Sequence, residues 1–190
     1  GAAAGALIGA FGFTAWQNSN ETEVYAVATF TIAAMAWLAC RWRTRRGTPG
    51  ARRSLLLIVY LAGLSVGNHL LALLAGPAIV AFLAVTLRMS PAADSGERKR
   101  EWGQVAVVAG VWALLVGTGL GSTALAAAGA VAFAAAAVFA VSAGAGTFAL
   151  ASLALAVVGV SPYLFLYLRS AQHPMINEAA PATFDALVAV

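Results

Sequence analysis

The stretch that decides the fold is SLLLIVYLAGLSVGNHLLALLAGPAIVAFLAVTLRM, residues 54–89. It is apolar almost throughout, and it is much longer than the roughly 20 residues that carry a helix across a bilayer. Gly67, Asn68 and His69, followed by Gly76-Pro77, provide a place for the chain to turn. We therefore expect two membrane-spanning helices, over residues 54–70 and 71–89, joined as a tight hairpin.

Similar apolar segments occur on both sides of this hairpin. They cover residues 1–15, 24–41, 104–120, 123–142 and 146–168. The turns between the last three are marked only by glycine and small polar residues, near 119–122 and 142–146. A transmembrane β-barrel is excluded because residues 125–141, for example, are apolar on every face. The prediction is an all-α fold, a polytopic transmembrane helical bundle of about seven spans.

The composition supports a membrane protein. Hydrophobic residues make up 62% of the 190 residues and charged residues 9%, whereas soluble domains have roughly 25% charged residues. The net charge of +4 would be compatible with a nucleic-acid partner, but the arginines flank membrane spans and have no interleaved aromatic residues. We expect the lipid bilayer as a partner and no nucleic acid.

The positive charges predict the orientation of the bundle. Lysine and arginine are retained in short cytoplasmic loops, and with seven alternating spans ten of the eleven basic residues face one side. These ten are Arg41, Arg43, Arg45, Arg46, Arg52, Arg53, Arg88, Arg98, Lys99 and Arg100. We expect that side to be the cytoplasm, and the membrane to be a bacterial inner membrane. Arg169 then lies on the outer side, with Glu21, Glu23, Glu178 and Asp185.

Two of the outer polar clusters occur early in the chain. Glu21 and Glu23 lie in a short loop just before a span, where carboxylates can act as a general base, bind a divalent cation or hold sugar hydroxyls. Alternatively, they only solvate the loop and favour the start of the next helix. Asn68 and His69 lie at the hairpin turn. A histidine there can bind phosphate, transfer a proton or ligate a metal, or it can simply cap a helix.

The third outer cluster follows the last span. Arg169 could bind a lipid phosphate through its bidentate guanidinium group. It could equally be an arginine that extends to the membrane surface without binding anything. We divide the chain into a helical bundle, residues 1–168, and a non-cytoplasmic loop that leads into a further helix, residues 169–190. Because residue 1 is a glycine within an apolar run, we expect the chain to be part of a larger protein.

Three motifs, taken together and in this order, resemble a known family. They are Trp16 with EVYA at 23–26, YLAGLSVGNHLL at 60–71, and RSAQHPMINE at 169–178. The family contains bacterial and eukaryotic multi-pass membrane proteins, was first described as a domain of unknown function, and is now associated with protein O-mannosyltransferase activity.

The resemblance implies a fold and a reaction. The implied fold is the GT-C type, in which a helical bundle transfers a sugar, here mannose, from a polyprenyl-phosphate donor to a protein acceptor outside the cytoplasm. The principal base of such enzymes lies in an outer loop upstream of the first span present here. Glu21 and Glu23 are then supporting carboxylates. The residues implied in binding the donor phosphate or the substrate are Tyr25, Asn68, His69, Arg169, Asn177 and Glu178. His173 stands where the family motif often has a small or polar residue, and the resemblance assigns it no role.

Two other functions fit the same sequence. A transporter or flippase would have several spans and a polar outer vestibule, although transporters usually place ionisable residues in the middle of the membrane. A non-catalytic structural subunit would not need Glu23, His69 or Arg169. The sequence leaves the cofactor unknown, and a divalent cation is one that this chemistry could use.

Overall fold

A computed structural model describes residues 1–13, 25–90, 94–175, 181, 183 and 186–187. Within these residues the fold is helical and contains no β-strand, which confirms the predicted all-α class. The α-helices are α1 (Ala2–Phe11), α3 (Tyr25–Thr44), α4 (Pro49–Asn68), α5 (Gly76–Met89), α6 (Ser95–Gly119), α7 (Thr123–Ser142), α8 (Gly146–Val160) and α9 (Leu164–Ser170). Two 3-10 segments, η1 (Leu70–Ala75) and η2 (Ser161–Tyr163), join them.

The hairpin predicted within residues 54–89 is confirmed. Helix α4 ends at Asn68, and His69 takes an extended backbone conformation with φ −163° and ψ 122°. An extended residue cannot continue a helix, so the chain reverses direction there. The returning segment begins as η1 and becomes α5 at Gly76, with Pro77 in the first turn, where its missing N–H has no helical partner.

The two glycine-marked turns are also confirmed. One connects α6 to α7 and the other connects α7 to α8. Gly121 and Gly144 have φ values of +63° and +72°, a left-handed conformation that glycine adopts without steric cost. In the first turn the hydroxyl of Ser122 accepts a hydrogen bond from the N–H of Leu125, and this cap begins α7.

Five segments in the described part of the chain are long and apolar enough to cross a membrane. They are Pro49–Asn68, Leu70–Met89, Ser95–Gly119, Thr123–Ser142 and Gly146–Ser170. Of the roughly seven predicted membrane spans, five are therefore supported in the described part of the chain. Helix α1 has 10 residues, about half the length needed to span. Helix α3 has 20 residues, but Arg41 and Arg43 in its last turn lower its apolar character.

The predicted start of one segment was wrong for a physical reason. The segment expected at 104–120 is α6, which already begins at Ser95. Hydropathy identifies only the apolar part of that helix, whereas the charged residues before it, Glu97 to Glu101, are good helix formers and extend the helix toward its start. The segment expected at 146–168 is confirmed as the candidate span Gly146–Ser170, within which Pro162 lies in the short 3-10 segment η2 between α8 and α9.

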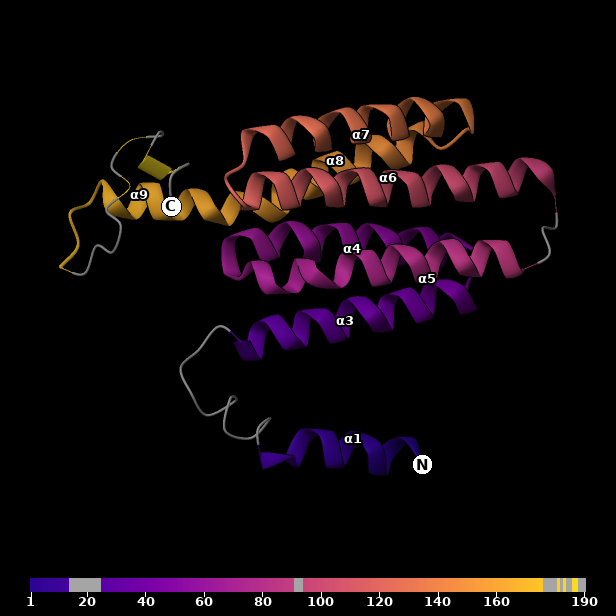
Figure 1. Ribbon diagram of the computed structural model, residues 1–190, viewed down its shortest axis with the longest axis horizontal. Helices are drawn as coiled ribbons and strands as arrows, with labels where there is room; N and C mark the ends of the chain where they lie inside the picture. Colours follow the sequence, from indigo (N-terminus) through magenta and orange to yellow (C-terminus); the bar gives the residue numbers. More distant parts are fainter. Residues whose placement is uncertain (14–24, 91–93, 176–180, 182, 184–185, 188–190) are drawn as a thin grey trace.

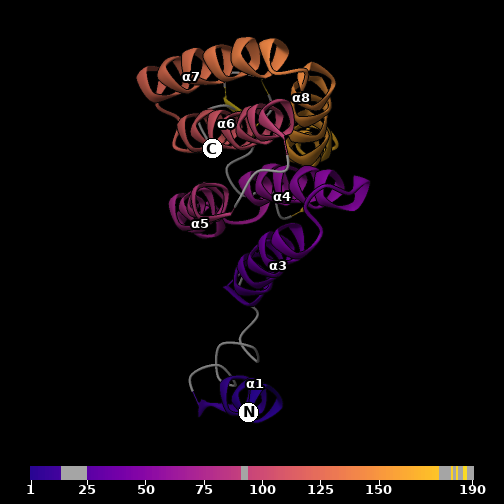
Figure 2. The same ribbon diagram turned by 90° about the vertical axis from the view of Figure 1, so that its right-hand side faces the viewer.

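Helices α3 to α8 run back and forth along one direction, and α1 lies apart from them with none of its residues buried (Figures 1 and 2). The bundle therefore has two ends. The basic end contains the end of α3, the start of α4, the end of α5, the start of α6 and the α7–α8 turn. The histidine end contains Tyr25, Asn68, His69 and the α6–α7 turn, and α9 continues beyond it.

The core is packed in two ways. Between α3, α4, α5 and α8 it consists of large buried side chains, including Met35, Trp42, Leu55, Ile58, Leu83 and Phe148. Between α6 and α7 the backbones themselves approach. A Cβ atom at Gly117 would lie 2.6 Å from the Cα of Ala126, closer than real Cβ contacts. At the basic end the same pair is wider, since a Cβ at Gly103 would lie 3.1 Å from the Cα of Ala140.

One buried hydrogen bond connects the hairpin to α6. The Nε1–H of Trp112 donates to the carbonyl oxygen of Leu73 in η1 at 2.9 Å. The indole lies against Gly76, where any Cβ would overlap the Trp112 ring. The residue that begins α5 therefore has to be a glycine, and the hairpin turn at His69 is held against the rest of the bundle.

Candidate functional site

Four of the eight predicted site residues lie within the described part of the chain: Tyr25, Asn68, His69 and Arg169. The other four, Glu21, Glu23, Asn177 and Glu178, lie outside it. The supporting-carboxylate role of Glu21 and Glu23 stays a prediction, as do the roles of Asn177 and Glu178. All four described residues belong to the histidine end or to α9 beyond it.

Tyr25 and His69 come together, although 44 positions separate them in the sequence. Tyr25 is the first residue of α3, and His69 follows the last residue of α4. Their ring centroids are 5.3 Å apart, and the ring planes are tilted by 59°. This is within the range in which aromatic rings attract each other through offset or edge-to-face contacts. The fold thus joins residues from the first and second family-like motifs.

The hydrogen bonding of His69 determines which ring nitrogen faces outward. Its Nδ1 accepts a hydrogen bond from the backbone N–H of Leu71 at 3.1 Å. An accepting Nδ1 has no proton, so in the neutral imidazole the proton is on Nε2. The Nε2–H is then a donor directed away from the backbone that Nδ1 caps. Such a group can donate a hydrogen bond to an anionic oxygen at this end of the bundle.

Close helix packing holds the end of α4 in place. A Cβ at Gly63 would lie 2.8 Å from the carbonyl oxygen of Ala156 in α8, and a Cβ at Gly159 would lie 2.7 Å from that of Tyr60. Gly67, four residues after Gly63, lies against Tyr163 in η2. The interpretation as a packing residue is therefore confirmed for Gly63, whereas a Cβ at Gly67 would make an ordinary contact. They support the exposed Asn68 and the half-buried His69 that follow them.

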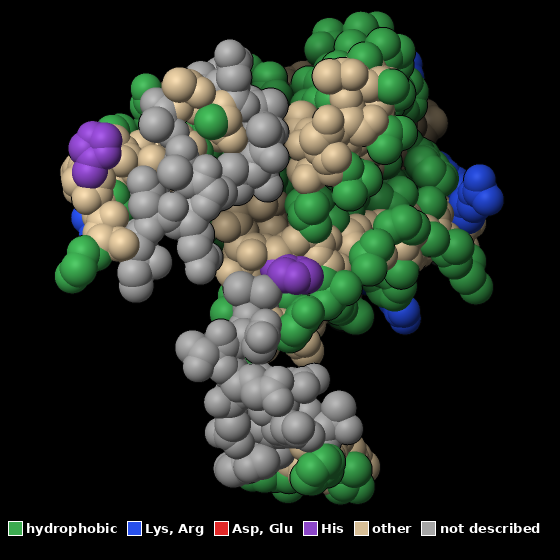
Figure 3. Space-filling view, turned by 60° about the vertical axis from the view of Figure 1, so that its left-hand side comes forward, with side chains coloured by type: hydrophobic (Ala, Val, Ile, Leu, Met, Phe, Trp, Pro, Cys, Tyr) green, Lys and Arg blue, Asp and Glu red, His purple; other side chains and the backbone are tan. Residues whose placement is uncertain are grey.

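Arg169 is placed differently from Tyr25 and His69. It lies in the last turn of α9, is exposed, and donates from Nη1 to the side-chain oxygen of Gln172 at 3.3 Å. Among the described residues no contact connects Arg169 with Tyr25 or His69. Figure 3 shows both histidine side chains of the chain at the surface, at separate positions. His173 follows α9 with a φ of +48°, so the third motif forms a group of its own.

The basic end holds an ion pair that sequence reasoning missed. Nε and Nη2 of Arg46 donate to the two carboxylate oxygens of Glu101, at 3.0 and 2.6 Å. The hydrogen bonds that Arg46 donates to Glu101 raise the pKa of Arg46, partial burial opposes this, and the charges of Glu101 and Glu97 add to the increase. The predicted orientation places Arg46 and Glu101 on the same side of the membrane, but nothing in the sequence indicates which of the arginines there pairs with Glu101.

The described residues contain no group of three or more histidine, cysteine or acidic side chains that could hold a metal ion. A cleft of about 460 Å³ lies at the basic end, away from Tyr25 and His69. Asp94, Gly96, Glu97, Lys99, Arg100, Ser142 and Ala143 line it. Tyr25 and His69 therefore lie at the opposite end of the bundle from this cleft.

Residues 1–92 match the model of a family described as Protein O-mannosyl-transferase TMEM260 N-terminal domain. This confirms the resemblance, and the match covers the first two motifs, around residues 16–26 and 60–71. The third motif, at 169–178, lies beyond the matched residues. Searches of curated proteins and of solved structures found no significant match.

Proposed function

We propose, from the match of residues 1–92, that this chain is a membrane-embedded part of a glycosyltransferase of the GT-C type. The enzyme transfers a sugar, mannose in the first instance, from a polyprenyl-phosphate donor to a protein acceptor. Transfer takes place on the non-cytoplasmic side, at the histidine end of the bundle. In this orientation the basic end faces the cytoplasm, and α3 and the segment that contains α1 complete the set of spans.

The observation that supports this proposal best is the contact between Tyr25 and His69. Both residues lie within the family match, and they come from different helices. The outward Nε2–H of His69 is the type of donor that a departing phosphate requires. This donor lies at the end opposite the ten basic residues. The candidate site residues are therefore separated along the bundle from the positive charges that predict its orientation.

The proposed roles follow from the charge that develops during transfer. As the bond between the sugar and the lipid phosphate breaks, negative charge accumulates on the phosphate oxygens. His69 and Arg169 stabilise this charge, and Tyr25 and Asn68 lie beside His69 at the same end of the bundle. Glu21 and Glu23 support a principal base located upstream, which takes the proton from the acceptor hydroxyl. Asn177 and Glu178 belong to the loop that contacts the acceptor.

The test is a transfer assay with full-length protein in proteoliposomes that contain polyprenyl-phosphate mannose and an acceptor protein. We expect His69→Ala to lower the rate of transfer about a hundredfold, the effect of losing one donor to a developing anion. Arg169→Ala should lower it by a similar factor. Arg88→Ala is the matched control, because Arg88 is an exposed arginine at the other end, and its rate should remain that of the wild type.

A second substitution separates the two nitrogens of His69. In His69→Asn, the side-chain oxygen can still accept the bond from the N–H of Leu71, but the Nε2 donor is absent. We expect this variant to remain folded and to be as inactive as His69→Ala. If both variants and Arg169→Ala transfer mannose at the wild-type rate, the assigned roles are wrong. Movement of the lipid-linked sugar across the bilayer without any transfer would favour the flippase alternative.

A further inference from the structure

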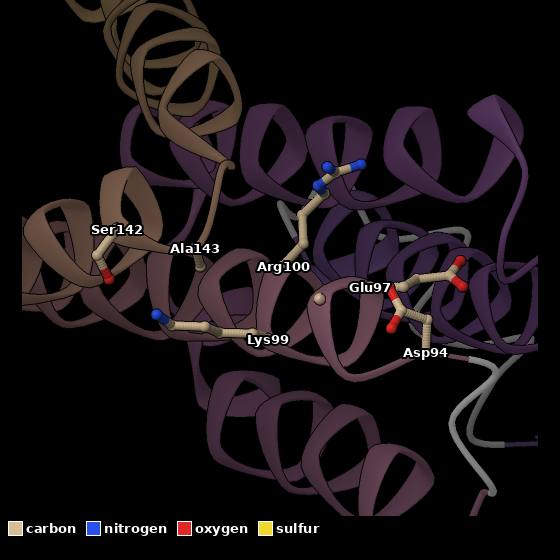
Figure 4. A pocket seen from close by; sticks show the side chains of 7 residues that line it. Asp94, Glu97, Lys99, Arg100, Ser142 and Ala143 are labelled. Atoms are coloured by element: carbon tan, nitrogen blue, oxygen red, sulfur yellow. The ribbon is translucent and has the colours of Figure 1, made fainter.

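The basic end has a second feature, around the turn between α7 and α8. Three basic side chains surround this turn, and we call Arg52, Lys99 and Arg100 the basic cradle. Arg52 donates from Nη2 to the hydroxyl of Thr147 in the first turn of α8 at 3.2 Å. The guanidinium group of Arg100 lies beside Gly144, 3.8 Å from where its Cβ would be. Lys99 extends along α6 toward Ser142 (Figure 4).

Three acids lie near the cradle, and two of them, Asp94 and Glu97, line the cleft together with Lys99 and Arg100. Glu101 is paired with Arg46. The Oε1 of Glu97 lies 3.4 Å from the Cβ position of Gly47, so this carboxylate faces the α3–α4 loop. Asp94 contacts the hydroxyl of Ser95, its neighbour in the chain. Among the described residues no carboxylate forms an ion pair with a cradle residue, and all three cradle side chains are exposed.

Exposed apolar side chains occur on α7 and α8, the two helices that meet at this turn. Val138 and Val141, in the last turns of α7, are 71% and 65% exposed. Leu150, in the first turns of α8, is 71% exposed. A soluble anion would make no use of these side chains. A molecule with an anionic head and apolar chains would contact the cradle and the apolar surface together.

We propose that the basic cradle and the adjoining faces of α7 and α8 form a binding site for an anionic phospholipid. The headgroup phosphate accepts hydrogen bonds from Arg52, Lys99 and Arg100, and the acyl chains lie along Val138, Val141 and Leu150. Charge-assisted hydrogen bonds to phosphate are the strongest that these side chains make. The headgroup lies in the cleft that Lys99 and Arg100 line together with Ser142 and Ala143.

The test measures lipid binding to the full chain, purified in a neutral detergent, by native mass spectrometry. Phosphatidylglycerol, phosphatidylcholine and inorganic phosphate are titrated separately. The cradle variant combines Arg52→Gln, Lys99→Gln and Arg100→Gln. The matched control combines Arg43→Gln, Arg45→Gln and Arg88→Gln, which removes the same charge from exposed arginines of the same end. Circular dichroism verifies that both variants are folded.

We expect the wild type to bind phosphatidylglycerol in preference to phosphatidylcholine. The cradle variant should lose affinity for phosphatidylglycerol by about fivefold for each charge removed, as expected for basic residues near an anionic lipid surface, and the control variant should keep the wild-type preference. An equal loss of affinity for phosphatidylglycerol in both variants would overturn the proposal, because the lipid would then be attracted by the total positive charge of the basic end and not by the cradle. Inorganic phosphate binding as tightly as the lipid would also overturn it, in favour of a soluble anion.

Discussion

The two ends of the bundle are held together by different forces. Near the histidine end, α6 and α7 approach so closely at Gly117 that backbone meets backbone. Near the basic end the same helices are wider apart, a cleft opens, and charged side chains make the connections, as in the pair of Arg46 and Glu101. The end that is rigid by backbone packing also carries Tyr25 and His69.

The largest effect on the free energy of unfolding should come from a methyl group added to α6 near the histidine end, compared with the same addition near the basic end. Gly117→Ala should destabilise the bundle by about 3 kcal/mol, the upper range for overpacking, because the new Cβ meets backbone atoms that cannot move aside. Gly103→Ala should cost less than about 1 kcal/mol. Both substitutions raise the helix propensity by the same amount. The difference in stability between the two variants, measured by thermal unfolding in detergent, therefore reports the cost of packing alone. Equal costs would show that the two ends are equally tight.

A smaller effect should follow from removing the ion pair. We expect the coupling energy between Arg46→Ala and Glu101→Ala, measured in a double-mutant cycle, to be about 2 kcal/mol, typical of a charged hydrogen-bonded pair. Both side chains are less than a fifth exposed, at 18% and 12%. Arg45→Ala, at an exposed position nearby, is the control and should change stability by less than about 0.5 kcal/mol. A coupling energy near zero would contradict the role of side-chain connections at this end.

The same pair predicts how stability responds to alkali. The hydrogen bonds that Arg46 donates to Glu101 raise the pKa of Arg46 above its usual value. A raised pKa means that the stabilisation is fully present below the unfolded-state value and is lost only as the pH rises through the folded-state value. Between pH 7 and pH 10, the stability difference between the wild type and Arg46→Ala should therefore stay constant. A difference that shrinks across this range would contradict a permanently charged Arg46.

The smallest effect concerns the ring contact at the histidine end. Tyr25→Ala should destabilise the start of α3 by about 1 kcal/mol, the amount typical of an aromatic pair. Tyr25→Phe keeps the ring and should leave stability unchanged. Hydrogen exchange of the α3 and η1 amides measures both variants locally. If Tyr25→Phe is as destabilised as Tyr25→Ala, the hydroxyl group rather than the ring makes the contribution.

Much of the fold could be predicted from the sequence, because the elements end where local chemistry requires it. Gly67-Asn68-His69 and Gly76-Pro77 predicted the hairpin, and the glycines at 121 and 144 predicted the two later turns. The start of α6 at Ser95 could not be found from hydropathy, because that helix continues beyond its apolar part. The number of spans could not be derived securely either, since arginines in the last turn of α3 dilute an otherwise apolar helix.

For the candidate site, the sequence could predict at which end of the bundle the residues lie, but not which of them contact each other. Alternation of the spans placed Tyr25 and His69 at the same end, but their ring contact depends on the angle at which α3 packs against α4. The tautomer of His69 depends on an N–H two residues later, whose position follows from the extended backbone at the turn. Two long-range interactions were not predictable, because each residue has several chemically equivalent partners in the sequence. They are the ion pair of Arg46 with Glu101 and the hydrogen bond from Trp112 to Leu73.

The 3-10 geometry of η1 has a consequence for the choice of membrane. A 3-10 helix rises about 2.0 Å per residue, compared with about 1.5 Å in an α-helix. The six residues of η1 therefore make the segment Leu70–Met89 about 3 Å longer than an all-α segment with the same number of residues. Because hydrophobic mismatch sorts proteins among bilayers that differ by a few ångströms, this hairpin is fitted to a slightly thicker hydrocarbon layer than its residue count implies.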